Sequence, residues 1–95
     1  MTTLSDEAIG EALAGLPGWE LVGGQITKQY RLGGFAGAIT FVVRLSYEAE
    51  AADHHPDLDI RHERVRVTLS THSERGVTAK DLDLARAIDA VQPRS

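Results

Sequence analysis

The feature that most constrains the fold is a strict alternation of apolar and polar side chains over residues 65–70. Val65, Val67 and Leu69 are apolar, and the residues that follow each of them are arginine, threonine and serine. Successive side chains of a strand point to opposite faces of the sheet. The alternation therefore predicts a strand with one buried face and one face open to water, which favours a sheet with helices on one side only.

Two β-hairpins are expected around this strand. The four strands are expected over residues 19–22, 25–32, 57–61 and 65–71. Gly23-Gly24 is a two-residue hairpin signal, and the second hairpin turns near His62-Glu63, where His62 is expected to be an exposed turn residue. Trp19, the only tryptophan, is expected in the core because aromatic residues dominate small cores.

Three helical segments flank and separate the hairpins. The first is expected over about residues 6–14 with Ser5 as its N-cap, and the last opens at Thr78, where Thr78 and Asp81 have the form of a capping box. The middle helix is expected over about residues 35–54. Its apolar stripe consists of Phe35, Ile39, Val42, Leu45 and Ala49. The order α-β-β-α-β-β-α indicates an α+β fold with an antiparallel sheet and helices on one face, in a single domain over residues 1–95.

Composition excludes several classes of function. The chain has 95 residues, a formal net charge of −4 and no cysteine. The acidic balance gives no basic footprint for nucleic acid, and the lack of cysteine removes disulfides, thiolate metal sites and a cysteine nucleophile. The longest nearly apolar run, residues 35–43, is too short to span a bilayer, and the N-terminus has no signal-peptide pattern. We therefore expect a cytoplasmic protein that binds neither nucleic acid nor membrane.

The candidate chemistry gathers around His54-His55-Pro56. Glu50 lies one helical turn before His54, so the two side chains are expected on one helix face, where the carboxylate would hold the imidazole in one tautomer. Pro56 disfavours a helical conformation of His55, so the helix is expected to end there and the two imidazoles to diverge. His72 closes the last expected strand and is a third candidate. A plain surface helix end is the alternative interpretation of the His-His-Pro segment.

Three histidines beside carboxylates indicate general acid–base catalysis, because histidine gains or loses a proton near neutral pH. The carboxylates concerned are Glu50, Asp53, Asp57 and Asp81. Ser70 and Ser73 flank His72, but neither lies in a nucleophile elbow, so a serine hydrolase is not favoured. A zinc site is the more specific alternative interpretation, since three histidines can bind zinc. Against it, adjacent histidines diverge and no H-E-x-x-H spacing is present, so we expect no metal.

Three blocks of sequence together resemble one family. They read Glu50-x-x-x-His54-His55-Pro56, Val65-x-Val67-Thr68-Leu69-Ser70-Thr71-His72 and Gly76-Val77-Thr78-x-x-Asp81-x-x-Leu84-Ala85. In order and spacing they resemble the pterin-4a-carbinolamine dehydratase family, and the resemblance extends over nearly the whole chain. It implies the α+β fold inferred above, with a four-stranded antiparallel sheet and three helices, and assembly into a homodimer or homotetramer.

The resemblance also implies an activity and a set of residues. The family dehydrates 4a-hydroxytetrahydropterin to quinonoid dihydropterin and water, supports recycling of tetrahydrobiopterin for aromatic amino acid hydroxylases, and needs no metal or organic cofactor. Its catalytic histidines correspond to His54, His55 and His72, and Glu50 corresponds to a supporting acid. The expected substrate-binding positions are Asp81, Thr71, Pro56 and Leu58. Many animal members carry tryptophan where this chain has Leu58, and Asp81 is equally a candidate for helix capping.

Two alternatives stay open beside the dehydratase. The family fold also serves as a non-enzymatic dimerisation or assembly module, and the apolar first half of the helix over 35–54 leaves a partner surface available. The other alternative is an acid–base enzyme on a different pterin-related substrate, because leucine offers less surface for stacking a pterin than tryptophan does. Within the dehydratase hypothesis, His54 and His72 would flank the 4a-hydroxyl, and His55 would help to bind or protonate the substrate.

Overall fold

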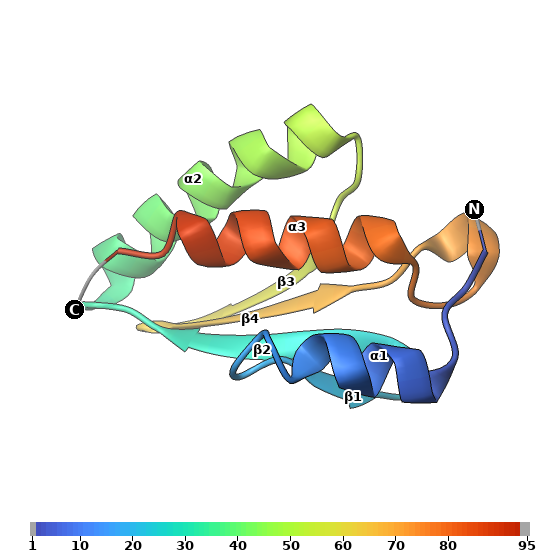
Figure 1. The fold of residues 1–95 in the computed structure, drawn as a ribbon. Coiled ribbons are helices and arrows are strands. Elements are labelled where there is room, and N and C mark those ends of the chain that lie inside the picture. The colour runs from blue at the N-terminus through green and yellow to red at the C-terminus, as the bar shows by residue number, and fades with distance from the viewer. Residues whose placement is uncertain (1, 94–95) are drawn as a thin grey trace.

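A computed structural model describes residues 2–93 and shows one antiparallel sheet and three helices (Figure 1). The strands are β1 (Glu20–Val22), β2 (Gln25–Arg31), β3 (Asp57–Arg61) and β4 (Arg64–Leu69), in the spatial order β1-β2-β4-β3. The helices are α1 (Asp6–Leu13), α2 (Phe35–Ala52) and α3 (Ala79–Ala90). The predicted α+β fold and its element order are therefore confirmed.

The alternation along β4 sets the two faces of the sheet. Val65, Val67 and Leu69 are buried against the helices, as the sequence predicts. Val65 lies opposite Tyr30 of β2 and Ile60 of β3, and cross-strand partners share a face. The central strands β2 and β4 therefore carry the helix-facing core, and the polar residues between them face outward.

Helix α2 covers the sheet with a different stripe from the one predicted. Its buried residues are Ala38, Phe41, Leu45 and Ala49. The prediction was correct for Leu45 and Ala49 but wrong for Phe35 and Ile39, which are 55% and 37% exposed. The first half of this helix is apolar on nearly every side, so periodicity alone could not select the face that meets the sheet.

Helix α2 also ends earlier than predicted. It stops at Ala52, and Asp53 adopts a left-handed conformation with φ of 49°. The Asp53 N–H donates to the carbonyl of Glu50, and the His54 N–H donates to that of Ala49 at 3.0 Å, which is the hydrogen-bond pattern of a Schellman motif. His54 therefore lies outside the helix, and the predicted shared face of Glu50 and His54 does not exist.

The capping predictions are confirmed. The Ser5 hydroxyl accepts from the Ala8 N–H at the start of α1, and Thr78 with Asp81 forms a complete capping box at the start of α3. The segment between β4 and α3 was expected as a loop but contains a short 3₁₀ helix, η1 (His72–Glu74). Strand β4 ends at Leu69, two residues before the predicted end.

A polar cluster centred on Asp89 joins α3 to the first hairpin. Its carboxylate accepts hydrogen bonds from Trp19 Nε1 at 3.2 Å and from the Tyr30 hydroxyl, and it pairs with Lys28 Nζ at 2.9 Å. Trp19 is 5% exposed, which confirms its predicted place in the core. The cluster therefore fixes the C-terminal part of α3 against the first hairpin.

Candidate active site

A cavity of about 410 Å³ opens where the end of α2 meets the segment between β4 and α3. Six of the residues that line it are His54, His55, Pro56, Thr71, His72 and Lys80. The lining residues that follow α2 and those that follow β4 are distant in the sequence. They lie together because β3 and β4 pair antiparallel, so the end of β4 lies beside the start of β3, next to the end of α2. All three histidines that the sequence singled out thus face one cavity, which is within the size range of small-molecule sites.

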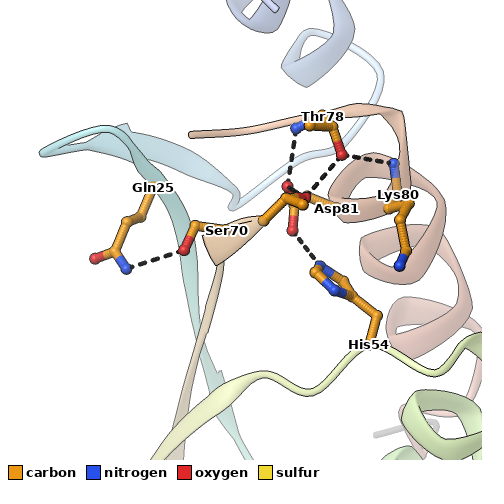
Figure 2. Close-up of polar contacts among 7 residues, drawn as sticks. Gln25, His54, Ser70, Thr78, Lys80 and Asp81 are labelled. Atoms are coloured by element: carbon orange, nitrogen blue, oxygen red, sulfur yellow. Dashed lines mark hydrogen bonds and ion pairs between the residues drawn. The ribbon is translucent and has the colours of Figure 1, made fainter. Parts of the chain in front are cut away.

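His54 is held by a carboxylate from another helix. Its Nε2 atom lies 2.5 Å from Asp81 Oδ1 (Figure 2), and the two side chains are 10% and 0% exposed. This bond leaves Nδ1 as the ring nitrogen available to a ligand. A buried carboxylate of this kind orients the imidazole and stabilises the imidazolium that forms when the ring takes up a proton.

Asp81 is itself fixed by the start of α3. Its Oδ2 atom accepts from the Thr78 backbone N–H at 2.9 Å and from Thr71 Oγ1 at 2.8 Å. The Thr71 and Thr78 hydroxyls lie 2.7 Å apart, and the Lys80 N–H donates to Thr78 Oγ1. The carboxylate therefore caps the helix, as one of the two sequence predictions for Asp81 has it, and also positions His54, a role that the sequence analysis gave to Glu50.

Glu50 contacts the other histidine of the pair. His55 Nε2 lies 2.7 Å from Glu50 Oε1, and both side chains are well exposed, at 61% and 75%. The prediction that Glu50 holds His54 was therefore wrong. The cause is the left-handed turn at Asp53, which directs His54 towards α3 and leaves His55 above the last turn of α2.

The remaining predicted positions divide between the cavity and its surroundings. Pro56 and Thr71 line it, while Asp81 lies behind His54 and Leu58 is a 38% exposed residue of β3 that is absent from the lining. Sequence reasoning overlooked Lys80, which lines the cavity next to the capping carboxylate. Its position just before Asp81 in the resemblance block was the available signal.

The cavity has mixed charge and no preformed cluster of metal ligands. Asp53 and Asp57 add two carboxylates to its wall, and Lys80 adds one cation. Within residues 2–93, no three side chains of the ligand types His, Cys, Asp and Glu are grouped so that they could hold a metal ion. In the same part of the chain, no helix is both long and apolar enough to cross a membrane.

Comparison with known families gives a match over residues 2–91 to the one described as pterin 4 alpha carbinolamine dehydratase. The chain belongs to this family. A relative from Chloroflexus aurantiacus is 48% identical over 91 residues, which are 96% of this chain and 98% of the relative. One from Nocardia farcinica is 50% identical over 91 residues, covering 94% and 96%. Both relatives carry the provisional name pterin-4-alpha-carbinolamine dehydratase.

Solved structures of the family agree with the fold. A Brucella melitensis protein described as a transcriptional coactivator/pterin dehydratase has a TM-score of 0.92 and 37% identity, over 97% of this chain and 100% of that one. A pterin dehydratase-like protein described as a RuBisCO assembly factor of the alpha-carboxysome has a TM-score of 0.65 and 19% identity, over 81% and 89%. The second likeness extends to the fold alone. The family resemblance inferred from the sequence is thus confirmed.

Proposed function

We propose that this chain dehydrates a 4a-hydroxytetrahydropterin to the quinonoid dihydropterin and water, by histidine general acid–base catalysis, in the recycling of a tetrahydropterin. The observation that carries the proposal is the cavity onto which His54, His55 and His72 converge, with His54 bonded to the buried Asp81. Membership of the dehydratase family supports the same activity.

The reaction needs one proton acceptor and one proton donor. The N5–H bond breaks, the C4a=N5 double bond forms from that electron pair, and the C4a–O bond breaks. The departing hydroxyl takes up a proton and leaves as water. Two imidazoles on one cavity supply this pair, one as the free base and the other as the imidazolium. Residues of the chain therefore suffice for the proton transfers.

His54 suits the role of proton donor. Asp81 holds its Nε2 atom, so a proton on Nδ1 would be directed at the leaving hydroxyl, and the carboxylate would balance the charge of the imidazolium. His72 lines the same cavity from η1 and would accept the N5 proton. His55, exposed and paired with Glu50, would help to bind the substrate or protonate it.

The test is stopped-flow decay of a freshly generated 4a-hydroxytetrahydropterin. Wild type should accelerate the decay over the spontaneous rate, and His72→Ala should lose about 10²–10⁴-fold of that acceleration, the usual contribution of one acid–base group. His62→Ala is the matched control, because His62 is the exposed turn residue between β3 and β4 and lies outside the cavity. A folded wild type without acceleration would refute the proposal.

One observation supports a second candidate, a non-enzymatic assembly role. Four apolar residues of α2 spaced one turn apart are exposed, namely Phe35, Ile39, Val43 and Tyr47. A continuous apolar stripe of this kind is typical of a surface that contacts protein. The two roles are separable, since a histidine substitution should abolish dehydration and leave any contact made through α2 intact.

A further inference from the structure

A second hollow adjoins the histidine cavity. It has a volume of about 330 Å³, and it shares Ser70 and His72 with the histidine cavity. Gln25 and Arg75 complete its side-chain lining, together with glycines of the first hairpin turn and of the loop after η1. Because two residues belong to both linings, one ligand of modest length could occupy both spaces. We call this second space the arginine hollow.

The arginine hollow differs from the histidine cavity in charge. Among the described residues, Arg75 is the one charged residue in the lining of the arginine hollow, whereas the histidine cavity has Asp53 and Asp57 in its wall. Among residues 2–93, no carboxylate lies within 4.0 Å of the Arg75 guanidinium. An exposed guanidinium with five N–H donors and no carboxylate partner favours an anion that offers two neighbouring oxygens, such as a carboxylate or a phosphate.

Local backbone structure fixes the wall between the two spaces. Arg75 ends η1 in a left-handed conformation with φ of 57°, and its N–H donates to the His72 carbonyl at 3.2 Å. Thr71 and Gly76 pair across the same loop through a hydrogen bond of 2.8 Å. His72 and Arg75 are therefore held on one short turn. His72 lines both spaces, and Arg75 lines only the arginine hollow.

The part of the arginine hollow that the first hairpin lines is polar and open. Gln25 Nε2 donates to Ser70 Oγ at 3.3 Å, and Gln25 and His54 lie on opposite sides of Ser70 in Figure 2. A Cβ atom added at Gly23 or Gly24 would meet nothing within 4 Å, so the turn leaves free space there. The hollow thus combines one cation, neutral donors and room for a substituent.

We infer that the arginine hollow binds the C6 substituent of the pterin and selects substrates in which that substituent carries an anionic group, a carboxylate or a phosphate. This inference rests on the proposed dehydratase function. Arginine forms paired hydrogen bonds with either anion, so the two share one recognition chemistry. The substrate class is a reduced pterin with an acidic side chain at C6.

This placement of the substituent also orients the reacting bonds. In the carbinolamine, C6 is bonded to N5, and N5 is bonded to C4a, which loses the hydroxyl. A substituent that crosses the wall at Ser70 and His72 brings the N5 edge of the ring to His72. His72 then takes the N5 proton as the C4a=N5 bond forms, and the imidazolium of His54 protonates the departing hydroxyl.

The experiment compares three 4a-hydroxytetrahydropterins that differ only at C6, with a methyl, a carboxylate-bearing and a phosphate-bearing substituent. Wild type should show kcat/KM about tenfold or more higher for at least one anionic substrate than for the methyl one, which is the effect of one charge-assisted hydrogen bond. Arg75→Gln should reduce kcat/KM for that substrate about tenfold more than for the methyl substrate. Arg86→Gln is the control, since Arg86 pairs with Asp83 on the exposed side of α3.

A binding measurement separates failure of this inference from failure of the proposed function. Calorimetric titration with stable 7,8-dihydropterins that bear the same three substituents requires no turnover. Tighter binding of an anionic ligand by wild type, lost in Arg75→Gln, would support the arginine hollow even if no carbinolamine were dehydrated. Equal affinities for all three ligands, or an Arg75→Gln effect that is the same for each, would overturn the inference whatever the activity.

Discussion

At the scale of single residues, the two histidines after α2 are bonded to different carboxylates. Asp81 is fully buried and bonded to His54, while Glu50 meets His55 in water. A buried, hydrogen-bonded carboxylate holds an imidazole firmly, whereas an exposed ion pair contributes little. The two acids therefore differ in function although the sequence motif contains both.

Asp81→Asn and Glu50→Gln form a matched pair of isosteric substitutions. Asp81→Asn should lower kcat for carbinolamine dehydration by about 10²–10⁴-fold, because the imidazolium of His54 loses its countercharge. Glu50→Gln should change kcat by no more than about fivefold, as expected for an exposed pair. Thermal unfolding of both variants checks that the fold is kept. A larger loss in Glu50→Gln than in Asp81→Asn would contradict the assignment.

The sequence identified the histidines of the cavity but assigned the wrong acid to His54. Glu50 and His54 are four positions apart, so a continuous helix would have placed them together. Asp53 breaks that helix by adopting a left-handed conformation, which is uncommon for a residue other than glycine. The real partner, Asp81, lies 27 positions away, and only tertiary structure brings the two side chains together.

At the scale of elements, α3 is anchored at both ends by a carboxylate. Asp81 caps its N-terminus beside the cavity, and Asp89 near its C-terminus accepts hydrogen bonds from Trp19 and Tyr30. Burial, together with the neighbouring Asp89 carboxylate, raises the pKa of Tyr30 far above its ordinary value of 10.0. The folded protein therefore keeps the Tyr30 proton at a pH where the unfolded chain releases it.

This difference predicts a loss of stability in alkali. Below pH 10.0, Tyr30 is protonated in both states and its contribution is fully present. Above that pH the unfolded state alone loses the proton, so the free energy of unfolding should fall by about 1.4 kcal/mol per pH unit from this group. Tyr30→Phe should be less stable at neutral pH but should show a shallower decline between pH 10 and 11. Urea unfolding across this range measures both slopes, and equal slopes would refute the prediction.

The elements themselves followed from the sequence with small errors. Strand alternation, the Gly23-Gly24 turn and the two helix caps are local signals, and each located its element within about two residues. The short helix η1 was missed because a single 3₁₀ turn has no periodicity to detect. The buried face of α2 was misassigned in its first half. Apolar residues surround the helix there, so only packing against the sheet decides which of them are buried.

At the scale of the whole molecule, the exposed surface of α2 is more apolar than is expected of a monomeric protein. Val43 and Tyr47 on α2 are 50% and 71% exposed, in line with Phe35 and Ile39. An exposed stripe of this kind favours contact with another protein surface, because burying it removes apolar area from water. The expectation of a homodimer or homotetramer stays a prediction, and this stripe supports it.

Sedimentation velocity tests the assembly. Wild type should sediment as a dimer or tetramer at micromolar concentration, and Ile39→Glu combined with Val43→Glu should shift it towards the monomer, because two like charges one helical turn apart would be buried without partners. Arg44→Glu is the control, because Arg44 is exposed, follows Val43 directly and is not one of the stripe residues. A monomeric wild type at the same concentration would contradict the prediction.

Catalysis by the His54–Asp81 pair is tested by the decay of 4a-hydroxytetrahydropterin with wild type, His54→Ala and His62→Ala, followed by stopped flow at neutral pH. We predict acceleration by wild type and by His62→Ala, and a loss of about 10²–10⁴-fold in kcat for His54→Ala with its fold retained. Equal rates for the three proteins, or a wild type that leaves the spontaneous decay unchanged, would contradict a dehydratase that works through the His54–Asp81 pair.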